Sequence, residues 1–175
     1  MGRNLEIMYI VKSKRLGLKP MTSEIIEAAL NNLSSLEKAI QSHVLEDFLE
    51  PVYTQRVLPI RLHKTMVNPD LAEWYGFIVE LESNTVVGTM GFKMPPDEEG
   101  LIEIGYGIHH TFQGKGYATE MAVALIDWAF QQKNVKGITA TNVLKNNHPS
   151  IKILEKLGMQ VVQQTAEKID YILLK

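Results

Sequence analysis

The stretch that decides the fold runs from Glu103 to Phe130 and reads EIGYGIHHTFQGKGYATEMAVALIDWAF. Its first part alternates large apolar residues with polar or small ones, which is typical of a β-strand. Its last part carries apolar residues at helical spacing. Gly114 and Gly116 separate the two patterns. The sequence therefore predicts a strand that leads through a glycine-bearing turn into a helix.

The flanking sequence repeats these two periodicities. The expected strands are one or two within 7–18, then 74–81, 85–94 with a hairpin turn at Ser83-Asn84, 101–108, 136–143 and a pair within 159–174. The first expected helix starts at Thr22 or Ser23, and the second is capped by Ser34 or Ser35. The others cover 53–66, 117–131 and 149–157. Pro59 should kink or divide the third helix. A strand–helix–strand crossover requires parallel strands, so the predicted class is α/β, a mixed sheet flanked by helices.

Composition limits the classes of function. A chain of 175 residues is long enough for one domain, which we expect to span 1–175. The net charge of −2 argues against a nucleic-acid partner, which requires a basic excess. A basic cluster within 12–19 is expected to be a solvated strand edge. The longest apolar run, Met121 to Ile126, is too short to cross a bilayer, so no membrane partner is expected.

Two absences concern compartment and chemistry. The N-terminus has no apolar signal-peptide core, so a cytoplasmic location is expected. There is no cysteine, which excludes disulfides, cysteine-ligated zinc and a thiol nucleophile. The histidines His109, His110 and His148 lack metal-ligand spacing, so no metal is expected and loop exposure explains them better.

The glycine turn is a candidate anion site. The start of a helix leaves backbone N–H groups without partners and carries partial positive charge. Glycines would let a phosphate approach those groups, and Lys115 could add a cation. A ligand-free connection is about as compatible with the spacing. The dinucleotide signature fails, because Thr119 occupies its third glycine position and 131–147 contains no acidic residue. The triphosphate-loop signature is absent as well.

Two motifs resemble a known family. Gln113-Gly114-Lys115-Gly116-Tyr117-Ala118 resembles the Gln/Arg-x-x-Gly-x-Gly/Ala motif of the GNAT family of N-acetyltransferases. The stretch 147–159, NHPSIKILEKLGM, resembles the family's second signature, Asn-x-x-Ser followed by Glu-Lys-Leu-Gly-Phe. The stretch 14–22 and the Glu103–Tyr106 step are similar to the branch that acetylates the N-termini of ribosomal proteins. The resemblance covers roughly residues 12 to 160 and implies the GNAT fold, with two splayed parallel strands.

The resemblance also implies a cosubstrate, acetyl-coenzyme A. Its pyrophosphate would lie on the glycine loop, and its pantetheine arm would bond to strand backbone and to an asparagine. The residues so assigned are Tyr106, Ile108, Gln113, Gly114, Lys115, Gly116, Tyr117, Ala118, Thr119 and Asn147. Gly105 and Gly107 agree independently, since glycine inside a strand often marks close approach of another group, although local twist is the alternative. Asn147 is equally well suited to be a helix cap.

The reaction implied is acetyl transfer to a primary amine, either a protein N-terminal α-amino group or a small amine. Without cysteine, direct attack in a ternary complex is the natural mechanism. Glu103, on the strand expected to hold the pantetheine, is the candidate general base, with a solvated outer-face position as the alternative. Asn142 occupies a position where one family branch has its base, and it cannot accept a proton. The usual tyrosine acid is replaced by Leu154, which leaves Ser150 as the hydroxyl nearest the sulfur.

These departures keep a second function open. The chain could be a non-catalytic module of this fold that binds coenzyme A or an acyl-coenzyme A as a regulatory ligand. Thiol release against a panel of amines separates the two. The sequence does not identify the acceptor, and it leaves the oligomeric state open, with a homodimer among the alternatives.

Overall fold

The computed structural model describes residues 8–175. The chain forms two compact units, Met1–Thr89 and Met90–Lys175. Strand β4 (Thr85–Phe92) begins in the first unit and ends in the second. The single domain expected over 1–175 stays a prediction. Ile7, the first residue of the first expected strand, lies outside the described residues.

The strands of the first unit form an antiparallel group that β4 extends. They are β1 (Val11–Lys12), β2 (Leu16–Pro20) and β3 (Tyr75–Glu80). In β2, Leu18 lies opposite Val11 of β1 and opposite Ile78 of β3, so β2 is an interior strand. β3 and β4 are hydrogen-bonded neighbours, as the predicted hairpin requires. Asn84 in their turn has a φ of 49°, a conformation that asparagine adopts more readily than most residues.

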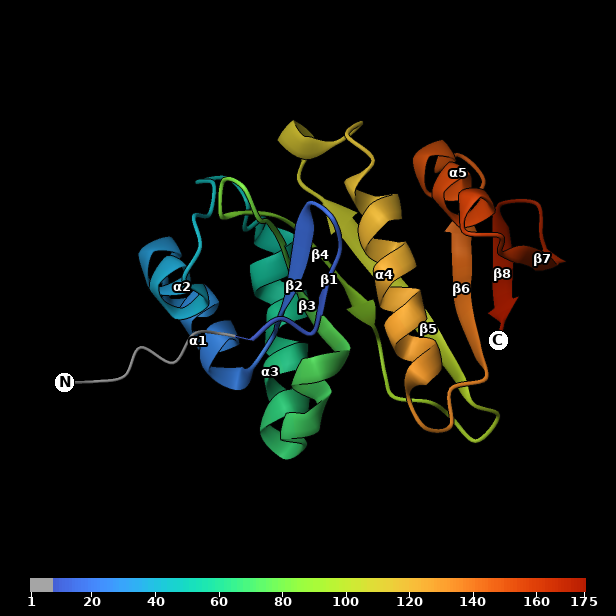
Figure 1. The fold of residues 1–175 in the computed structure, drawn as a ribbon, viewed down its shortest axis with the longest axis horizontal. Helices are drawn as coiled ribbons and strands as arrows, with labels where there is room; N and C mark the ends of the chain where they lie inside the picture. Colours follow the sequence, from blue (N-terminus) through green and yellow to red (C-terminus); the bar gives the residue numbers. More distant parts are fainter. Residues whose placement is uncertain (1–7) are drawn as a thin grey trace. The chain divides into compact units, whose positions relative to one another are not determined.

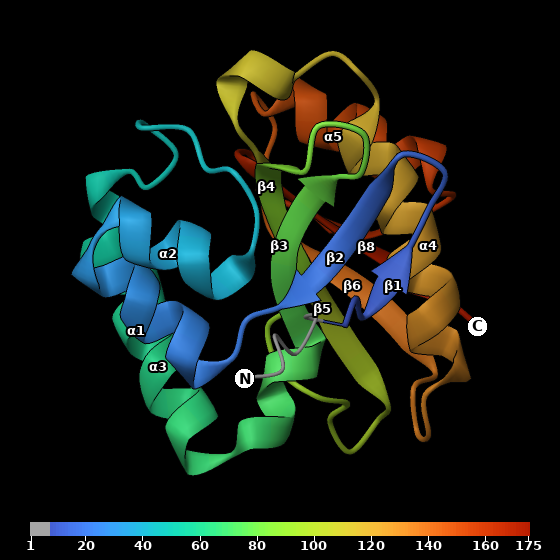
Figure 2. The ribbon, with the colours of Figure 1, turned by 60° about the vertical axis from the view of Figure 1, so that its left-hand side comes forward.

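Three α-helices belong to the first unit, and Figure 2 shows them grouped beside β2 and β3. They are α1 (Ser23–Asn31), α2 (Leu33–Ile40) and α3 (Leu58–Val67). Thr22 caps α1, as predicted, by accepting a hydrogen bond from the Ile25 N–H. The cap of α2 was predicted at Ser34 or Ser35, two or three residues too late, because the observed cap is Asn32. Asn32 has an extended backbone that ends α1 and begins α2, and its side chain accepts from the Ser35 N–H at 2.8 Å.

Pro59 divides the third predicted helix. A π-helical turn, η1 (Tyr53–Val57), precedes α3, and Pro59 lies in the first turn of α3. Proline has no N–H, so it cannot donate to the carbonyl four residues earlier, and the regular helix is interrupted there. A 3₁₀ turn that the sequence did not predict, η2 (Pro69–Trp74), connects α3 to β3 and is capped by Asn68.

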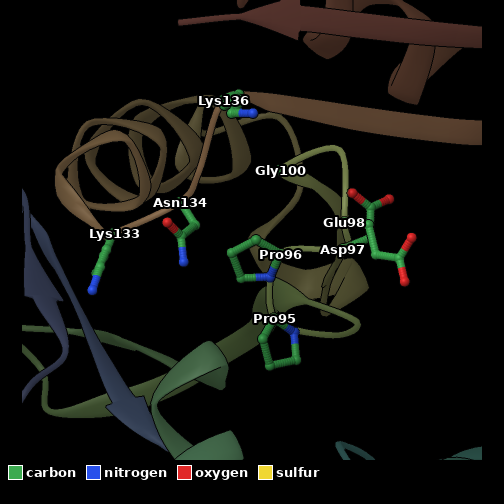
Figure 3. Close-up of a pocket in the computed structure, with 8 residues that line it drawn as sticks. All are labelled: Pro95, Pro96, Asp97, Glu98, Gly100, Lys133, Asn134 and Lys136. Carbon is green, nitrogen blue, oxygen red and sulfur yellow. The ribbon is translucent and has the colours of Figure 1, made fainter.

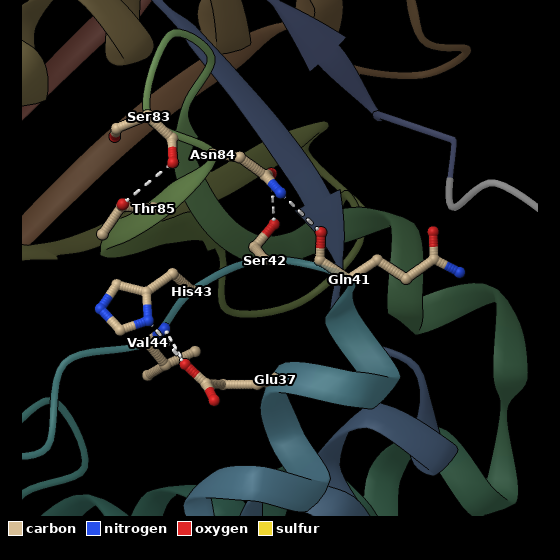
Figure 4. Close-up of polar contacts among 8 residues, drawn as sticks. All are labelled: Glu37, Gln41, Ser42, His43, Val44, Ser83, Asn84 and Thr85. Atoms are coloured by element: carbon tan, nitrogen blue, oxygen red, sulfur yellow. Dashed lines mark hydrogen bonds and ion pairs between the residues drawn. The ribbon is translucent and has the colours of Figure 1, made fainter.

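The segment after α2 is held by the β3–β4 turn, as Figure 4 shows. Asn84 donates through its amide to the Gln41 carbonyl at 3.0 Å, and the His43 N–H donates to the Asn84 carbonyl at 2.9 Å. The Glu37 carboxylate accepts from the Val44 N–H at 2.9 Å and contacts His43 Nδ1 at 2.8 Å. The Val44 N–H, followed by His43, lowers the pKa of Glu37.

The basic residues within 12–19 were expected to lie on a solvated strand edge. This is wrong for Lys19, which is only 4% exposed. Its ammonium donates to the Ile40 carbonyl at 2.8 Å and to the Ser42 hydroxyl at 3.0 Å. These acceptors lie at the end of α2, where carbonyls lack helical partners and the helix dipole is negative. The expectation failed for Lys19 because β1 pairs outside β2, so β2 is not the edge.

The second unit contains the predicted crossover (Figure 1). Its strands lie in the order β4, β5 (Leu101–Ile108), β6 (Gly137–Leu144), β8 (Lys168–Leu174), β7 (Gln160–Gln164). Helix α4 (Tyr117–Gln131) connects β5 to β6, and α5 (His148–Lys156) follows β6. β5 and β6 are parallel, whereas β8 is antiparallel to both β6 and β7. The fold is therefore mixed α/β, with a mixed sheet flanked by helices.

The predicted bounds of β5 and α4 agree with the structure. One stripe of α4 supplies buried residues to the core of the second unit: Tyr117, Ala118, Met121, Ala122, Leu125, Ile126 and Ala129. Gly158 follows α5 with a φ of 76°, the left-handed conformation common just past a helix end. None of the helices in the described part of the chain combines the length and apolarity needed to cross a membrane.

Candidate active site

Strands β5 and β6 pair only over their first residues. The parallel register runs from Leu101 opposite Gly137 to Glu103 opposite Thr139. β5 then continues to Ile108, while β6 continues alongside β8. Beyond Glu103, the edge of β5 that faces β6 has no strand partner within residues 8–175. This is the splay of parallel strands that the resemblance implied.

The backbone groups along that edge can be identified. The Thr139 hydroxyl of β6 donates to the Ile102 carbonyl at 3.4 Å. The Glu103 carbonyl faces the opposite edge of β5 and accepts from the Lys93 N–H at 2.9 Å. Backbone groups alternate in direction along a strand, so those of Tyr106 and Ile108 point to the same side as those of Ile102. Strand β5 thus directs the backbone groups of Tyr106 and Ile108, the two residues predicted to bind the pantetheine arm, toward its unpaired edge. The Ile108 carbonyl already accepts from Gln113 Nε2 at 3.0 Å, which leaves its N–H.

The glycine loop lies beyond the end of β5 (Figure 1). Gly114 and Gly116 have φ of 77° and 79°, a left-handed conformation that side chains with a Cβ rarely adopt. A Cβ on Gly114 would meet no atom within 4 Å. Gly116 is the N-cap of α4 and offers no side chain to cap it. The start of this 15-residue helix is therefore bordered by bare backbone, at the positive end of its dipole.

The other predicted loop residues surround this helix start. The Tyr117 and Ala118 side chains are buried at 4% and 8% exposure, so only their backbone can face a ligand. Thr119 is half-buried in the first turn. The Lys115 ammonium lies 5.0 Å from the ring centre of Phe112 and 5.9 Å from that of Tyr117, which places a cation at the loop.

The start of α5 follows the end of β6, at the same end of the unit as the glycine loop (Figure 1). Asn147 caps α5, because its side-chain oxygen accepts from the Ser150 N–H at 3.3 Å. The alternative that Asn147 is a helix cap is thus observed. The cap uses the oxygen of the side-chain amide but not its N–H donors. Ser150 is not the cap, so its hydroxyl has no capping role. Leu154 is buried at 1% exposure and brings no polar group to the site.

Glu103 lies where the two strands part. Its carboxylate forms an ion pair with Lys93 and accepts a hydrogen bond at 2.8 Å from Thr141 of β6. The side chain is 27% exposed, so it is neither sequestered nor fully solvated. The carboxylate is held at the mouth of the splay, between a cation and a hydroxyl.

Tyr106 brings a side chain to the site that sequence reasoning missed, since it had assigned only its backbone. Its hydroxyl donates to the Ser150 carbonyl at 3.5 Å, and burial raises the pKa of Tyr106. The signal that could have found it is the alternation of β5, which puts Tyr106 on the same face as the buried Ile102 and Ile104.

Asn142, which cannot act as a base, lies in a β-bulge, and the bulge explains why asparagine stands at this position. The pairing of β6 with β8 shifts between Ala140 and Val143, and Asn142 has a φ of 58°. Its N–H donates to Asp170 at 2.6 Å, and its side-chain oxygen accepts from Lys168 at 3.3 Å. Asparagine tolerates this backbone conformation, so the position is explained by local structure.

The paired histidines lie between β5 and the glycine loop. His109 caps a short 3₁₀ turn, η3 (His110–Phe112), by accepting from the Thr111 N–H at 3.4 Å. The rings of His109 and His110 are 4.2 Å apart. His148, the first residue of α5, is exposed. The expectation that these histidines bind no metal stays a prediction.

A cavity of about 460 Å³ lies at the opposite end of the second unit (Figure 3). Its lining residues flank the start of β5 and the end of α4: Pro95, Pro96, Asp97, Glu98, Gly100, Lys133, Asn134 and Lys136. The Asp97 carboxylate is engaged by the Glu99 and Leu101 N–H groups. Figure 3 shows the Asp97 and Glu98 carboxylates pointing away from Pro96. Converging polar groups, the usual mark of a ligand pocket, are not found there.

Comparison with known proteins points to one family. The model of the GNAT acetyltransferase domain matches residues 15–160. The uncharacterized N-acetyltransferase YjdG of Bacillus subtilis is 30% identical over 165 residues, which cover 91% of this chain and 95% of that protein.

Solved structures share the fold. An acetyltransferase of the GNAT family from Bacillus anthracis superposes with a TM-score of 0.65 and 22% identity, covering 95% of this chain and 98% of that one. The ribosomal L7/L12 α-N-protein acetyltransferase RimL, solved in complex with coenzyme A, gives a TM-score of 0.69 at 16% identity over 95% of this chain and 98% of its own.

Proposed function

The chain belongs to the GNAT family of acetyltransferases, and we propose that it transfers an acetyl group from acetyl-coenzyme A to a primary amine by direct attack. The acceptor is a protein N-terminal α-amino group or a small amine. RimL, which has the same fold, is described as an α-N-protein acetyltransferase, and this supports an α-amino acceptor. An α-amino group has a pKa of ~8 against ~10.4 for lysine, so it is the easier amine to deprotonate at neutral pH.

The observation that carries the proposal is the combination of splay and glycine loop in one unit. The unpaired edge of β5 ends at the loop that begins α4. An extended chain can bond to the former while its phosphate end meets the positive start of the latter. A long thiol ester with a pyrophosphate fits this arrangement, and the RimL structure contains coenzyme A.

Coenzyme binding is assigned to the backbone of Tyr106 and Ile108 for the pantetheine arm and of 114–119 for the pyrophosphate. Gln113 holds the loop against the end of β5 through the Ile108 carbonyl. Lys115 supplies a cation near the phosphates. The Asn147 amide, whose oxygen caps α5, donates to the pantetheine.

Acetyl-coenzyme A supplies an activated acetyl group with a thiolate leaving group. Glu103 accepts the proton of the attacking amine, directly or through one water, because it is the carboxylate at the point where the strands part. Lys93 and Thr141 fix its orientation. Ser150 donates a hydrogen bond toward the sulfur as negative charge develops there, a modest electrostatic contribution.

The test is release of coenzyme A thiol from acetyl-coenzyme A by the full chain in the presence of a panel of amines. We expect amine-dependent thiol release with one acetylated amine formed per thiol, fastest with α-amino acceptors. Binding of acetyl-coenzyme A without turnover on any amine would instead support a regulatory module.

A further inference from the structure

The Tyr106 hydroxyl is a polar group of the second unit that takes no part in the acetyl transfer described above. Tyr106 lies in β5 beyond Glu103, where the pairing with β6 has ended. Its side chain is half-buried, so it is not a core residue. The hydroxyl donates to the Ser150 carbonyl, in the first turn of α5, at 3.5 Å. The side chain therefore reaches from the unpaired strand to the helix that follows β6.

The hydrogen bond from Tyr106 to Ser150 is a weak one. Hydroxyl groups prefer acceptors at about 2.7–2.8 Å, so a bond of 3.5 Å is long. A carbonyl in a helix also accepts from the N–H four residues on, so Tyr106 adds only a second hydrogen bond there. Hydrogen bonds to a charged acceptor are about twice as strong as those between neutral groups. The Tyr106 hydroxyl can therefore turn toward an anion beside α5 without losing a strong contact.

The Tyr106 hydroxyl keeps its proton at neutral pH. Burial raises the pKa of Tyr106, and a hydrogen bond with the Ser150 side chain opposes the rise. The ordinary tyrosine pKa is already ~10, so this hydroxyl is a donor throughout the neutral range. The effect of Ser150 also means that the hydroxyl groups of the two residues are neighbours.

Glu103 and Tyr106 lie on opposite faces of β5. They are three residues apart, and side chains alternate between the two faces of a strand. Glu103 contacts Lys93 and Thr141 on one face, whereas Tyr106 contacts Ser150 of α5 on the other. An extended ligand along the unpaired edge of β5 would therefore have a carboxylate on one face and two hydroxyls on the other.

The chemistry of the ligand indicates which of its groups the hydroxyl would serve. In the proposed site the pyrophosphate lies at the loop that follows β5, and the reacting end of the pantetheine arm lies toward Glu103. The amides of the arm are neutral, so they would offer Tyr106 no better acceptor than the Ser150 carbonyl does. The sulfur is the group of the arm that becomes negatively charged during transfer, and it is the acceptor that gains most from a donor.

We propose that the Tyr106 hydroxyl donates a hydrogen bond to the sulfur of coenzyme A as the thiolate forms, a catalytic role that rests on the acetyl transfer proposed above. The amine attacks the acetyl carbon, the C–N bond forms, and the electron pair of the C–S bond passes to sulfur. Glu103 takes the amine proton on one face, while Tyr106 and Ser150 donate to the sulfur on the other. A thiol with a pKa of ~8.5 is a stronger acid than tyrosine, so the proton stays on the Tyr106 oxygen. The thiolate takes its proton from water after release, and Glu103 returns its own to water.

The experiment compares the affinities of the full chain for coenzyme A and for desulfo-coenzyme A, which lacks the thiol, by calorimetry across pH. Titration of groups that the two complexes share cancels in the ratio of affinities. A donor to the thiolate lowers the pKa of the bound thiol, so this ratio should rise as pH passes ~8.5, the ordinary thiol pKa. The rise should be about tenfold larger in the wild type than in Tyr106→Phe, as expected for a hydrogen bond to a charged group. Equal rises in the two proteins would overturn the proposal.

Tyr171→Phe is the matched control. Tyr171 is buried at 2% exposure in β8, which pairs with the edge of β6 that faces away from β5. The variant loses the same hydroxyl in the same unit, and its affinity ratio should rise as in the wild type. A reduced rise in both variants would attribute the effect to packing of the unit and overturn the role of Tyr106. The melting temperature of Tyr106→Phe should change little, because the ring remains and only a long hydrogen bond is lost.

Turnover separates this proposal from the enzymatic one. With an amine that is acetylated, Tyr106→Phe should lower kcat about tenfold and leave KM nearly unchanged, because the hydrogen bond strengthens only as charge develops on sulfur. The affinity ratio needs no amine, so it tests Tyr106 even if no amine is ever acetylated. Unchanged kcat together with equal affinity ratios would leave the enzyme assignment standing and overturn the role of Tyr106.

Discussion

The two units arrange their polar groups in different ways. In the second unit, the unpaired edge of β5 and the glycine-bordered start of α4 offer backbone groups, and the nearby Tyr117 and Ala118 side chains are buried. In the first unit, side chains cluster in an apolar wall around Arg61, whose guanidinium lies 3.6 Å from the ring centre of the core residue Tyr75. A backbone site suits a ligand common to many proteins, because it demands only strand geometry and glycines. A cluster of side chains depends on the identity of each residue, so it can differ between relatives.

The largest effect we expect is on the chemical step in the second unit. Glu103→Gln should lower kcat by roughly 10²–10⁴-fold, the range typical of a general base, and leave coenzyme A affinity nearly unchanged. Assays of thiol release measure kcat, and calorimetry on the same preparation measures coenzyme A affinity. Glu99→Gln, in the exposed turn before β5, is the matched control and should leave both unchanged. A variant that keeps most of its rate at neutral pH would make Glu103 a structural residue.

The backbone character of the coenzyme site is tested at Gly116. Gly116→Val places a branched side chain at a φ of 79° and at the expected phosphate position, so coenzyme A affinity should fall by about 100-fold or more. Gly158→Val imposes the same backbone strain at a φ of 76° at the far end of α5, and it should weaken binding little. Equal losses in the two variants would attribute the effect to strain and remove the anion cradle.

Ser150 should have a smaller effect. Ser150→Ala should reduce kcat about tenfold, or about 1.4 kcal/mol, by removing the hydrogen bond to the departing sulfur. Its melting temperature should not change, because Asn147 is the residue that caps α5. Asn147→Ala is the contrasting variant, which should lose about 1 kcal/mol of stability with the cap. If Ser150→Ala lowers only the melting temperature, the hydroxyl acts in folding alone.

The smallest effect concerns a side-chain contact in the first unit. The pKa of Glu37 is lowered in the folded protein, so its contribution to stability is present above the ordinary carboxyl pKa and lost as pH falls through the folded value. Glu37→Gln should therefore melt below wild type at neutral pH, and the gap should close in acid. Denaturation curves measured across pH check this, and a gap that widens in acid would contradict the assigned contacts.

Much of the second unit could be predicted from the sequence because its signals are local. The alternation of 101–108 and the helical spacing of 117–131 set the bounds of β5 and α4, and the glycines mark the turn between them. Even so, the Tyr106 hydroxyl was missed, because its contact with Ser150 joins residues far apart in the chain.

The first unit was harder to predict because its polar groups depend on tertiary contacts. Several residues near the start of α2 could serve as caps. Asn32 is the cap because the backbone is extended at that residue, between the end of α1 and the start of α2. Lys19 looks like a surface residue until β1 covers the edge of β2 and α2 ends beside it. Arg61 lies between Ile60 and Leu62 in α3, and nothing local in the sequence indicates that it stacks on Tyr75.

The most direct test of a backbone-built coenzyme site is to follow the amide N–H resonances of the full chain while coenzyme A is added. The account predicts that the largest shifts fall in 104–108 and 114–119, with the Asn147 side-chain amide also affected. Shifts concentrated around the cavity at 95–100 and 133–136, or no shifts at saturating coenzyme A, would contradict it.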